Sequence, residues 1–122
     1  MARVLIVDDT DIVRKALELA VRKMGHDAVS TSDALNALAL ACAHPPDLAL
    51  LDFRMPGMDG VTLFHEMRNQ LGDRCPKVLF VSATPSEEVR AHTDESTRPV
   101  GYVKKPFHLD DLTRLVTEAL AA

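Results

Sequence analysis

The sequence predicts an α/β fold in which helices cover both faces of a five-stranded parallel sheet. Four short apolar runs recur along the chain without alternating with polar residues, which is typical of strands buried on both faces. Helical patterns separate the runs, so that strand and helix alternate five times and the crossovers are expected to be right-handed. The chain has 122 residues, of which 47% are hydrophobic, which predicts one packed domain over residues 1–122.

The predicted strands are all short. In chain order they span residues 4–7 (VLIV), 27–31 (DAVST), 48–51 (LALL), 78–81 (VLFV) and 100–103 (VGYV). The second strand is the weakest prediction, because it lacks the continuous apolar run of the other four. Those four are rich in β-branched or large apolar side chains, which favour strands.

Apolar residues at helical spacing predict four of the helices. The first helix has an apolar stripe that Gly25 ends, made of Ile12, Val13, Ala16, Leu17, Ala20, Val21 and Met24. The second is a small apolar helix over residues 34–43, which Ser32 or Asp33 opens. The stripe of the third helix is Val61, Phe64, Met67 and Leu71. The stripe of the last helix is Leu109, Leu112, Leu115, Val116, Ala119 and Leu120.

The fourth helix has a different pattern. Its start is well marked, because Thr84 can cap it, Pro85 suits the first helical position and Glu87 can complete a capping box. Only Val89 and Ala91 are apolar after that start. A helix with so small an apolar face is weakly held by packing, so we expect it to be short, frayed or mobile.

The composition excludes several classes of protein. A net charge of −4 argues against direct nucleic-acid binding, and no apolar run approaches the ~18 residues of a membrane span. Without a signal peptide, a soluble cytoplasmic protein is expected. Cys42 and Cys75 are expected to be buried, reduced thiols rather than a disulfide. The histidines lack metal-ligand spacing and are expected at the surface; they are His26, His44, His65, His92 and His108.

Polar side chains follow the predicted strands at one edge of the sheet. Asp8 and Asp9 come directly after the first strand, and Asp52 follows the third. Ser82 follows the fourth strand, and Lys105 follows the fifth. The carboxyl ends of parallel strands meet at one edge, where neighbouring strands lie ~4.8 Å apart, so these side chains can converge.

Three clustered carboxylates repel one another, and a divalent cation relieves that repulsion. Oxygen ligands that leave room for water suit Mg²⁺, with Mn²⁺ as the alternative. A nearby lysine adds a charge that can hold an anion, and a serine hydroxyl adds a hydrogen bond. The pattern therefore predicts a phosphoryl site, in which an aspartate that attacks phosphorus forms an acyl phosphate.

Taken together, these motifs resemble the receiver domain of bacterial two-component response regulators, of the chemotaxis-regulator type. The resemblance covers essentially the whole chain. It is carried by VDD (7–9), LLDFRMPGMDG (50–60), VSA (81–83) and YVKKPF (102–107), in the family's order and spacing. It implies a flavodoxin-like, doubly wound sheet with strand order 2-1-3-4-5 and five helices.

The resemblance also implies the ligands of the site. Asp52 is expected to be the phosphoacceptor. Asp8 and Asp9 are the expected acidic pair that holds Mg²⁺, with Asp52 and the backbone carbonyl of Arg54 as further ligands. The loop after Asp52 should then open with a tight turn at Pro56-Gly57, in which glycine supplies a positive φ if the turn is type II.

Three further residues take switch or contact roles by the same resemblance. Ser82 matches the switch hydroxyl that turns toward the phosphoryl group, and Lys105 matches the lysine that contacts this group. Tyr102 matches the aromatic switch that moves inward on activation. The bond between Lys105 and Pro106 is expected to be cis.

The implied function is a phosphorylation-driven switch rather than an enzyme. A histidine kinase or histidine phosphotransfer protein donates the phosphoryl group, and the domain assists its own phosphorylation and dephosphorylation. An unknown output partner is expected to bind the face formed by the fourth helix, the fifth strand and the fifth helix. The protein is then a monomer or a phosphorylation-dependent dimer, and either a single-domain regulator or the receiver of a longer protein.

Two other classes stay open at this point. One is an unphosphorylated pseudo-receiver, which would act only as an interaction module; such domains usually lack an acidic or lysine position that this chain has. The other is a Mg²⁺-dependent phosphatase with an aspartate nucleophile, because Asp9-Thr10-Asp11 loosely resembles the D-x-D motif of haloacid-dehalogenase-like enzymes. The short chain and this single match speak against the phosphatase.

Overall fold

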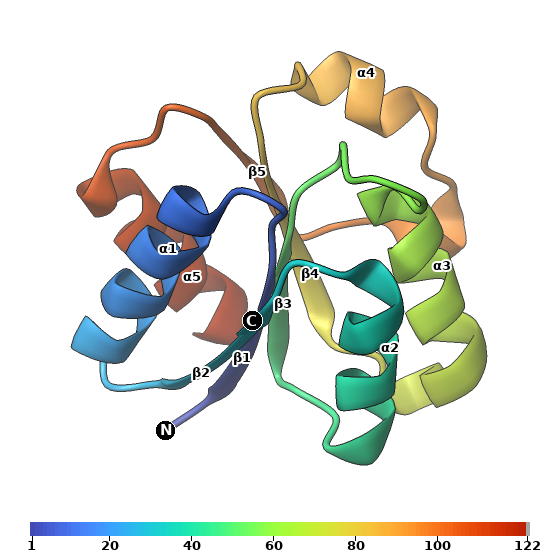
Figure 1. Cartoon of the computed structure of the whole chain (residues 1–122), viewed down its shortest axis with the longest axis horizontal. Helices are drawn as coiled ribbons and strands as arrows, with labels where there is room; N and C mark the ends of the chain where they lie inside the picture. The colour runs from blue at the N-terminus through green and yellow to red at the C-terminus, as the bar shows by residue number, and fades with distance from the viewer. Residues whose placement is uncertain (122) are drawn as a thin grey trace.

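The computed structural model describes residues 1–121, which form a five-stranded parallel sheet between two layers of helices (Figure 1). The strands are β1 (Arg3–Val7), β2 (Asp27–Thr31), β3 (Leu48–Leu51), β4 (Lys77–Ser82) and β5 (Gly101–Lys104). Their order in the sheet is β2-β1-β3-β4-β5, which confirms the predicted order. Residue 122, the last of the predicted domain 1–122, lies outside the described residues.

The five predicted helices are present. They are α1 (Asp11–Lys23), α2 (Ala34–Ala43), α3 (Gly60–Leu71), α4 (Ser86–Ala91) and α5 (Leu109–Ala121). Two short 3₁₀ helices, η1 (Gly72–Arg74) and η2 (Glu95–Thr97), follow α3 and α4. Figure 1 shows α1 and α5 on one side of the sheet and α2 and α3 on the other.

The three central strands β1, β3 and β4 each contribute to two separate hydrophobic cores, because successive side chains point to opposite faces of a sheet. In β1, Val4 and Ile6 join the core under α1 and α5, whereas Leu5 and Val7 join the core under α2 and α3. The strands β3 and β4 divide their side chains in the same way. This two-sided burial explains why the strand sequences do not alternate between apolar and polar residues.

Parallel register aligns the carboxyl ends of the central strands. Val7 pairs with Leu51, and Leu51 pairs with Phe80, so Asp8 and Asp52 leave neighbouring strands at the same level. Ser82 pairs with Lys104 at the end of β5. The residues that follow these strands are therefore delivered to one edge of the sheet.

Part of the predicted α1 stripe is wrong. Leu17, Ala20 and Val21 are buried as expected, but Ile12 is 82% exposed and Ala16 is also exposed. The stripe had about two apolar residues per helical turn, and only the narrow face that meets the sheet is covered, so one side of the stripe remains at the surface.

The predicted α5 stripe is also too long. It contains the buried Leu112, Val116 and Ala119, but Leu109 is 56% exposed at the helix start. Together with Ile12 and Phe107, Leu109 lines an apolar hollow of about 740 Å³ between α1 and the segment before α5.

The start of α4 also differs from the prediction. The helix begins at Ser86, and Pro85 stands at the N-cap position, where its ψ of 143° is extended rather than helical. Among the described residues no side chain caps this end, so the predicted roles of Thr84 and Glu87 in capping are wrong. The prediction of a short helix is confirmed, since it has six residues, of which Val89 alone is buried.

Other local predictions have mixed outcomes. Asp33, rather than Ser32, caps α2 by accepting a hydrogen bond from the Leu35 backbone N–H. Both cysteines are free thiols, but neither is fully buried: Cys75 is partly buried, and Cys42 is exposed because it follows Ala41 on the outer side of α2. The histidines are exposed except the partly buried His26, whose Nδ1 accepts a hydrogen bond from a backbone N–H. Among residues 1–121, no helix has the length and apolar character needed to cross a membrane.

A pair of substitutions in α1 tests the corrected buried face. Leu17→Ala should lower the free energy of unfolding by about 2–5 kcal/mol, because it opens a cavity at a side chain that is 1% exposed. Ile12→Ala removes a side chain that contacts mostly solvent, and should change this free energy by no more than about 0.5 kcal/mol. Urea unfolding at pH 7 measures both, and similar losses for the two variants would contradict the assignment.

Candidate functional site

Three carboxylates meet at the carboxyl edge of the sheet. One oxygen from each of Asp8, Asp9 and Asp52 lies within 4.8 Å of the others. Asp8 and Asp52 follow the paired ends of β1 and β3, and they are 1% and 7% exposed. Asp9 is exposed, so the cluster has a buried side and a side open to solvent. The predicted convergence of these three residues is confirmed.

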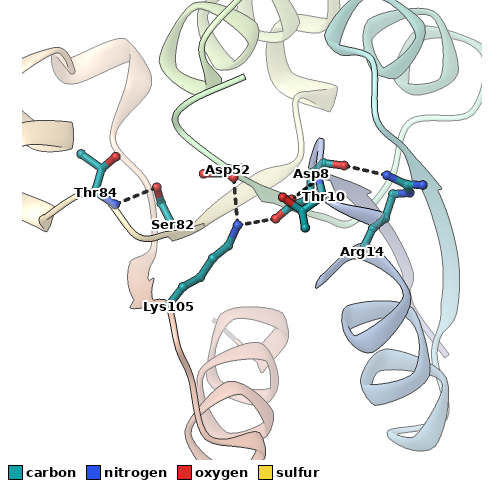
Figure 2. Close-up of polar contacts among 7 residues, drawn as sticks. All are labelled: Asp8, Thr10, Arg14, Asp52, Ser82, Thr84 and Lys105. Atoms are coloured by element: carbon teal, nitrogen blue, oxygen red, sulfur yellow. Dashed lines mark hydrogen bonds and ion pairs between the residues drawn. The ribbon is translucent and has the colours of Figure 1, made fainter. Parts of the chain in front are cut away.

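Lys105 joins two of these carboxylates. Its Nζ lies 2.6 Å from Asp8 Oδ2 and 2.9 Å from Asp52 Oδ2, as Figure 2 shows. Burial by itself would lower the pKa of Lys105, but its hydrogen bonds to Asp8 and Asp52, together with the negative charges of both carboxylates, outweigh burial and raise the pKa above its ordinary value. The lysine is therefore a fixed cation between two carboxylates. The bond from Lys105 to Pro106 is cis, as expected.

The backbone around Asp8 holds its carboxylate in place. Asp8 Oδ1 accepts a hydrogen bond from the Thr10 backbone N–H at 2.9 Å. The Arg14 side chain donates to the Asp8 carbonyl oxygen, also at 2.9 Å (Figure 2). Sequence reasoning missed Thr10 and Arg14, because these contacts depend on how α1 folds back over the end of β1.

The loop after Asp52 is built by glycines and a cap. Gly57 has a φ of +85°, which confirms the positive φ expected at the Pro56-Gly57 turn. Asp59 caps α3 by accepting a hydrogen bond from the Thr62 N–H at 2.7 Å. Gly60 then brings the start of α3 directly onto β3, and a Cβ there would collide with the Asp52 carbonyl oxygen.

Ser82 is buried at the end of β4, on the β5 side of the cluster. Its Oγ accepts a hydrogen bond from the Thr84 N–H at 3.1 Å, and Figure 2 shows the hydroxyl turned toward Thr84. The Lys105 N–H donates to the Ser82 carbonyl oxygen at 3.0 Å. Ser82 thus lies at the predicted edge, but its hydroxyl is engaged with the segment before α4 in this structure.

Tyr102 lies away from the carboxylates. Its ring is half-buried on β5 and stacks on Phe80, with 6.0 Å between ring centroids and 19° between the ring planes. The Arg90 guanidinium of α4 also lies over this ring, 5.1 Å from its centroid. Tyr102 can therefore act on the site only through neighbouring residues, as an indirect switch would.

The Arg54 side chain points away from the cluster toward α4. Its guanidinium lies 3.1 Å from the Glu88 carboxylate and 5.7 Å from the centre of the Phe53 ring. The pair is largely exposed, so it contributes little to stability by itself. It nevertheless connects the loop after Asp52 to α4, a contact for which the sequence contains no signal.

The donor set fits a hard divalent cation. All three acidic side chains offer oxygen, and the exposed Asp9 borders a hollow of about 440 Å³ that leaves room for water ligands. Mg²⁺ prefers such a set of a few carboxylates completed by water. Asp8, Asp9 and Asp52 could hold the ion.

Comparison with protein families agrees with the site and the fold. Residues 4–117 match the response regulator receiver domain. The chain therefore belongs to the family of response regulator receiver domains, and the resemblance inferred from its motifs is confirmed.

The chain is 37% identical to the regulatory protein AtoC of Escherichia coli over 122 residues, which cover 97% of this chain and 25% of that protein. Among solved structures it is similar to the chemotaxis protein CheY4 of Vibrio cholerae, with a TM-score of 0.88 and 25% identity over 98% of both chains. The receiver domain of the sensor histidine kinase PA1611 of Pseudomonas aeruginosa has the same fold. Its TM-score is 0.86 and its identity 23%, over 99% of this chain and 98% of that one.

The chain spans between 25% and 50% of the length of AtoC and the other curated relatives. The relatives are regulatory and transcriptional regulatory proteins. The whole relatives therefore contain regions that have no counterpart in this chain.

A substitution at Gly60 tests the close contact between α3 and β3. Gly60→Ala should lower the free energy of unfolding by about 1–3 kcal/mol, because the added methyl group meets the Asp52 backbone, which cannot move without disturbing the sheet. Thr62→Ala, in the same helical turn but exposed, is the control and should stay within about 0.5 kcal/mol. Urea unfolding of both variants measures the difference, and a stabilised Gly60→Ala protein would contradict the predicted clash.

A second substitution tests the charge of Lys105. Lys105→Met should lower the free energy of unfolding by about 3 kcal/mol in metal-free buffer, because two neighbouring carboxylates lose their shared cation. The pKa of Lys105 is raised in the folded protein, so the difference from wild type should be constant below about pH 10 and shrink as the pH rises through the folded pKa. Urea unfolding from pH 7 to pH 11.5 measures it, and a difference that fades between pH 7 and 9 would contradict the assignment.

Proposed function

We propose that this receiver domain is a phosphorylation-driven switch of a two-component system and that Asp52 is its phosphoacceptor. The observation that carries the proposal is the position of the Asp52 carboxylate. It lies at the sheet edge, 2.9 Å from the Lys105 ammonium, beside the buried Asp8 and the exposed Asp9. A nucleophilic carboxylate, a fixed cation and an acidic pair are the groups that phosphoryl transfer to an aspartate requires.

In the proposed reaction, an oxygen of Asp52 attacks the phosphorus of a phosphohistidine on a donor protein. A P–O bond to Asp52 forms as the P–N bond to the donor breaks, and the leaving imidazole nitrogen takes the electron pair and then a proton from solvent. Lys105 exchanges its contact with the Asp52 oxygen for one with an oxygen of the transferred group. Asp8, held by Thr10 and Arg14, keeps the lysine in line during this exchange.

The proposed metal ligands are Asp8, Asp9, Asp52 and the backbone carbonyl of Arg54. A bound Mg²⁺ would neutralise the negative charge of the acceptor and of the phosphoryl oxygens, which lowers the repulsion between them. Mn²⁺, which prefers similar ligands, is the alternative. The structure of the PA1611 receiver domain, which has a magnesium ion coordinated in its active-site cleft, supports this assignment.

Ser82 and Tyr102 are the proposed switch residues. When Ser82 turns its hydroxyl toward the phosphoryl group, it leaves the Thr84 N–H to which it is now bonded. That change loosens the segment before α4 and allows Tyr102 to move inward. The helix α4 itself can follow, because it has a single buried side chain, that of Val89. The face formed by α4, β5 and α5 would then change its affinity for an output partner.

The proposed donor is a histidine kinase or a histidine phosphotransfer protein. The apolar hollow of about 740 Å³ lies beside the site, since Lys105 itself forms part of its wall. A donor protein that covers this hollow would bury the exposed Ile12 and Leu109 while it reaches Asp52. The same proposal includes an output partner whose identity is unknown. It also includes a cytoplasmic location and a protein that is a monomer or a phosphorylation-dependent dimer.

We propose that residues 1–122 do not bind nucleic acid directly. The net charge of −4 disfavours direct contact between residues 1–122 and nucleic acid. The transcriptional regulators among the relatives are longer than this chain, so a DNA-binding output would lie in an additional module or a separate protein. We keep residues 1–122 as one receiver domain in this proposal.

The geometry disfavours both alternative functions. A pseudo-receiver would gain nothing from a complete acidic cluster with a lysine bonded to two of its members. A phosphatase with the D-x-D motif would need Asp9 and Asp11 in one site, but Asp11 pairs with Arg14 and does not belong to the carboxylate cluster. We therefore propose a signalling domain that is not an enzyme, apart from its part in its own phosphorylation and dephosphorylation.

Intact-mass measurement tests the acceptor directly. The wild-type protein incubated with acetyl phosphate and Mg²⁺ should gain one phosphoryl group, and removal of the metal with a chelator should slow the gain at least about tenfold. Asp52→Asn should abolish the gain, because an amide is a poor nucleophile toward phosphorus.

The matched control is Asp59→Asn, which changes the same charge in the same loop but keeps a side chain able to cap α3. This variant should be phosphorylated at close to the wild-type rate. A phosphoryl group that remains on Asp52→Asn would locate the acceptor elsewhere. Absence of any gain in the wild type would favour the pseudo-receiver.

A further inference from the structure

Tyr102 separates two hollows on the side of the molecule that carries α4. The inner hollow, of about 110 Å³, is bounded by Ser82, Thr84, Val89 and Tyr102. Its size is comparable with the roughly 150 Å³ of an engineered apolar cavity that admits benzene. The outer hollow, of about 550 Å³, is bounded by Tyr102 and by polar residues that include Arg90 and Arg98. Tyr102 borders both hollows, so its ring lies at the boundary between them.

Two contacts hold the ring in its present place, namely its stacking on Phe80 and the guanidinium of Arg90. The Arg90 guanidinium lies 5.1 Å from the centre of the Tyr102 ring, within the range of a cation–π interaction. In the described part of the chain Arg90 forms no ion pair with a carboxylate, so its charge is directed to the ring. Arg98 borders the same outer hollow, but it has no recorded contact with the ring among the described residues.

We propose that Arg90 is a positioning residue that holds the Tyr102 ring on the outer side and so sets the ratio of inward to outward positions. The proposal deepens the proposed function, because Tyr102 matters to signalling only if its ring position reports the state of Asp52. The contact itself belongs to the unmodified protein. The outward position of the ring, in contact with Arg90, competes with an inward position in the inner hollow beside Ser82. The Ser82 hydroxyl is bonded to Thr84 in this structure.

The proposal has a direct thermodynamic consequence. An exposed cation–π contact changes the equilibrium between two positions by about two- to fivefold. Loss of the contact should raise the inward-to-outward ratio by that factor. If the protein accepts a phosphoryl group mainly while Tyr102 is inward, and the inward form is the minor one, then the initial rate of phosphorylation rises in proportion to the population of that form.

The sequence offers a direct optical test. Tyr102 is the single tyrosine and the chain has no tryptophan, so intrinsic tyrosine fluorescence reports this ring alone. Acrylamide, a neutral quencher, measures its access to solvent in the unmodified protein. Arg90→Met keeps an unbranched, flexible side chain, shorter than that of arginine, and removes the charge. Arg98→Met is the matched control, because it removes the same charge beside the same hollow, and Arg90→Lys restores a cation.

We expect the quenching constant of Arg90→Met to fall below that of wild type, whereas Arg98→Met and Arg90→Lys stay close to wild type. Equal constants for the two methionine variants would overturn the proposal. A higher constant for Arg90→Met would also overturn it, because it would mean that Arg90 merely covers the ring.

Phosphorylation by acetyl phosphate separates this inference from the proposed function. The initial rate of mass gain should rise about two- to fivefold in Arg90→Met relative to Arg98→Met. If no variant is phosphorylated while the quenching difference persists, then the proposed function fails and the role of Arg90 stands. If all variants are phosphorylated at one rate and quenched alike, then the role of Arg90 fails and the proposed function stands.

Discussion

The contact of one ammonium group with two carboxylates is the interaction on which the rest of the site depends. Lys105 lies 97 residues from Asp8 and 53 residues from Asp52 in the chain, yet its Nζ bonds to both. Two largely buried carboxylates side by side would be unstable without a cation, and the lysine supplies one even in the absence of metal. The same contact connects the segment after β5 to the ends of β1 and β3. The geometry of the site and the packing of this sheet edge therefore depend on each other.

The sheet makes this contact possible because it is buried on both faces. Its two cores fix the register of β1, β3 and β4, and the register brings their carboxyl ends to one level. A shift by one residue would exchange the two core faces of a strand and move its terminal aspartate away from the lysine. Gly60 adds a second constraint, since α3 begins in contact with the Asp52 carbonyl and permits no side chain there. Asp52, the proposed acceptor, therefore stands where packing on both faces of the sheet and the start of α3 fix the backbone.

The helix α4 is held in the opposite way. Of its six residues only Val89 is buried. The other contacts described for this segment are pairs that involve one side chain each: Arg54 with Glu88, Phe53 with His92, Arg90 with Tyr102, and the buried pair Ser82 with Thr84. Segments with few buried apolar contacts are those that open most easily. Several of these contacts start from residues next to the acceptor, so a new charge on Asp52 would change them first. A rigid acceptor beside a loosely held helix is the arrangement that a phosphorylation switch needs.

The sequence by itself determined the fold class and most of the site, and its resemblance to receiver domains supplied the strand order. Buried parallel strands have a continuous apolar pattern, and the acidic, hydroxyl and lysine residues directly follow them, so topology alone predicts that Asp8, Asp9, Asp52, Ser82 and Lys105 meet. Only the tertiary structure decided which apolar residues of α1 face the sheet, that Pro85 rather than Thr84 stands at the start of α4, and that Arg54 and Arg90 turn toward Glu88 and Tyr102. The physical reason is that strand patterns reflect burial on both faces, which is a property of the segment itself. The width of a helix's buried face and the partner of an exposed cation depend instead on which distant segment packs beside it.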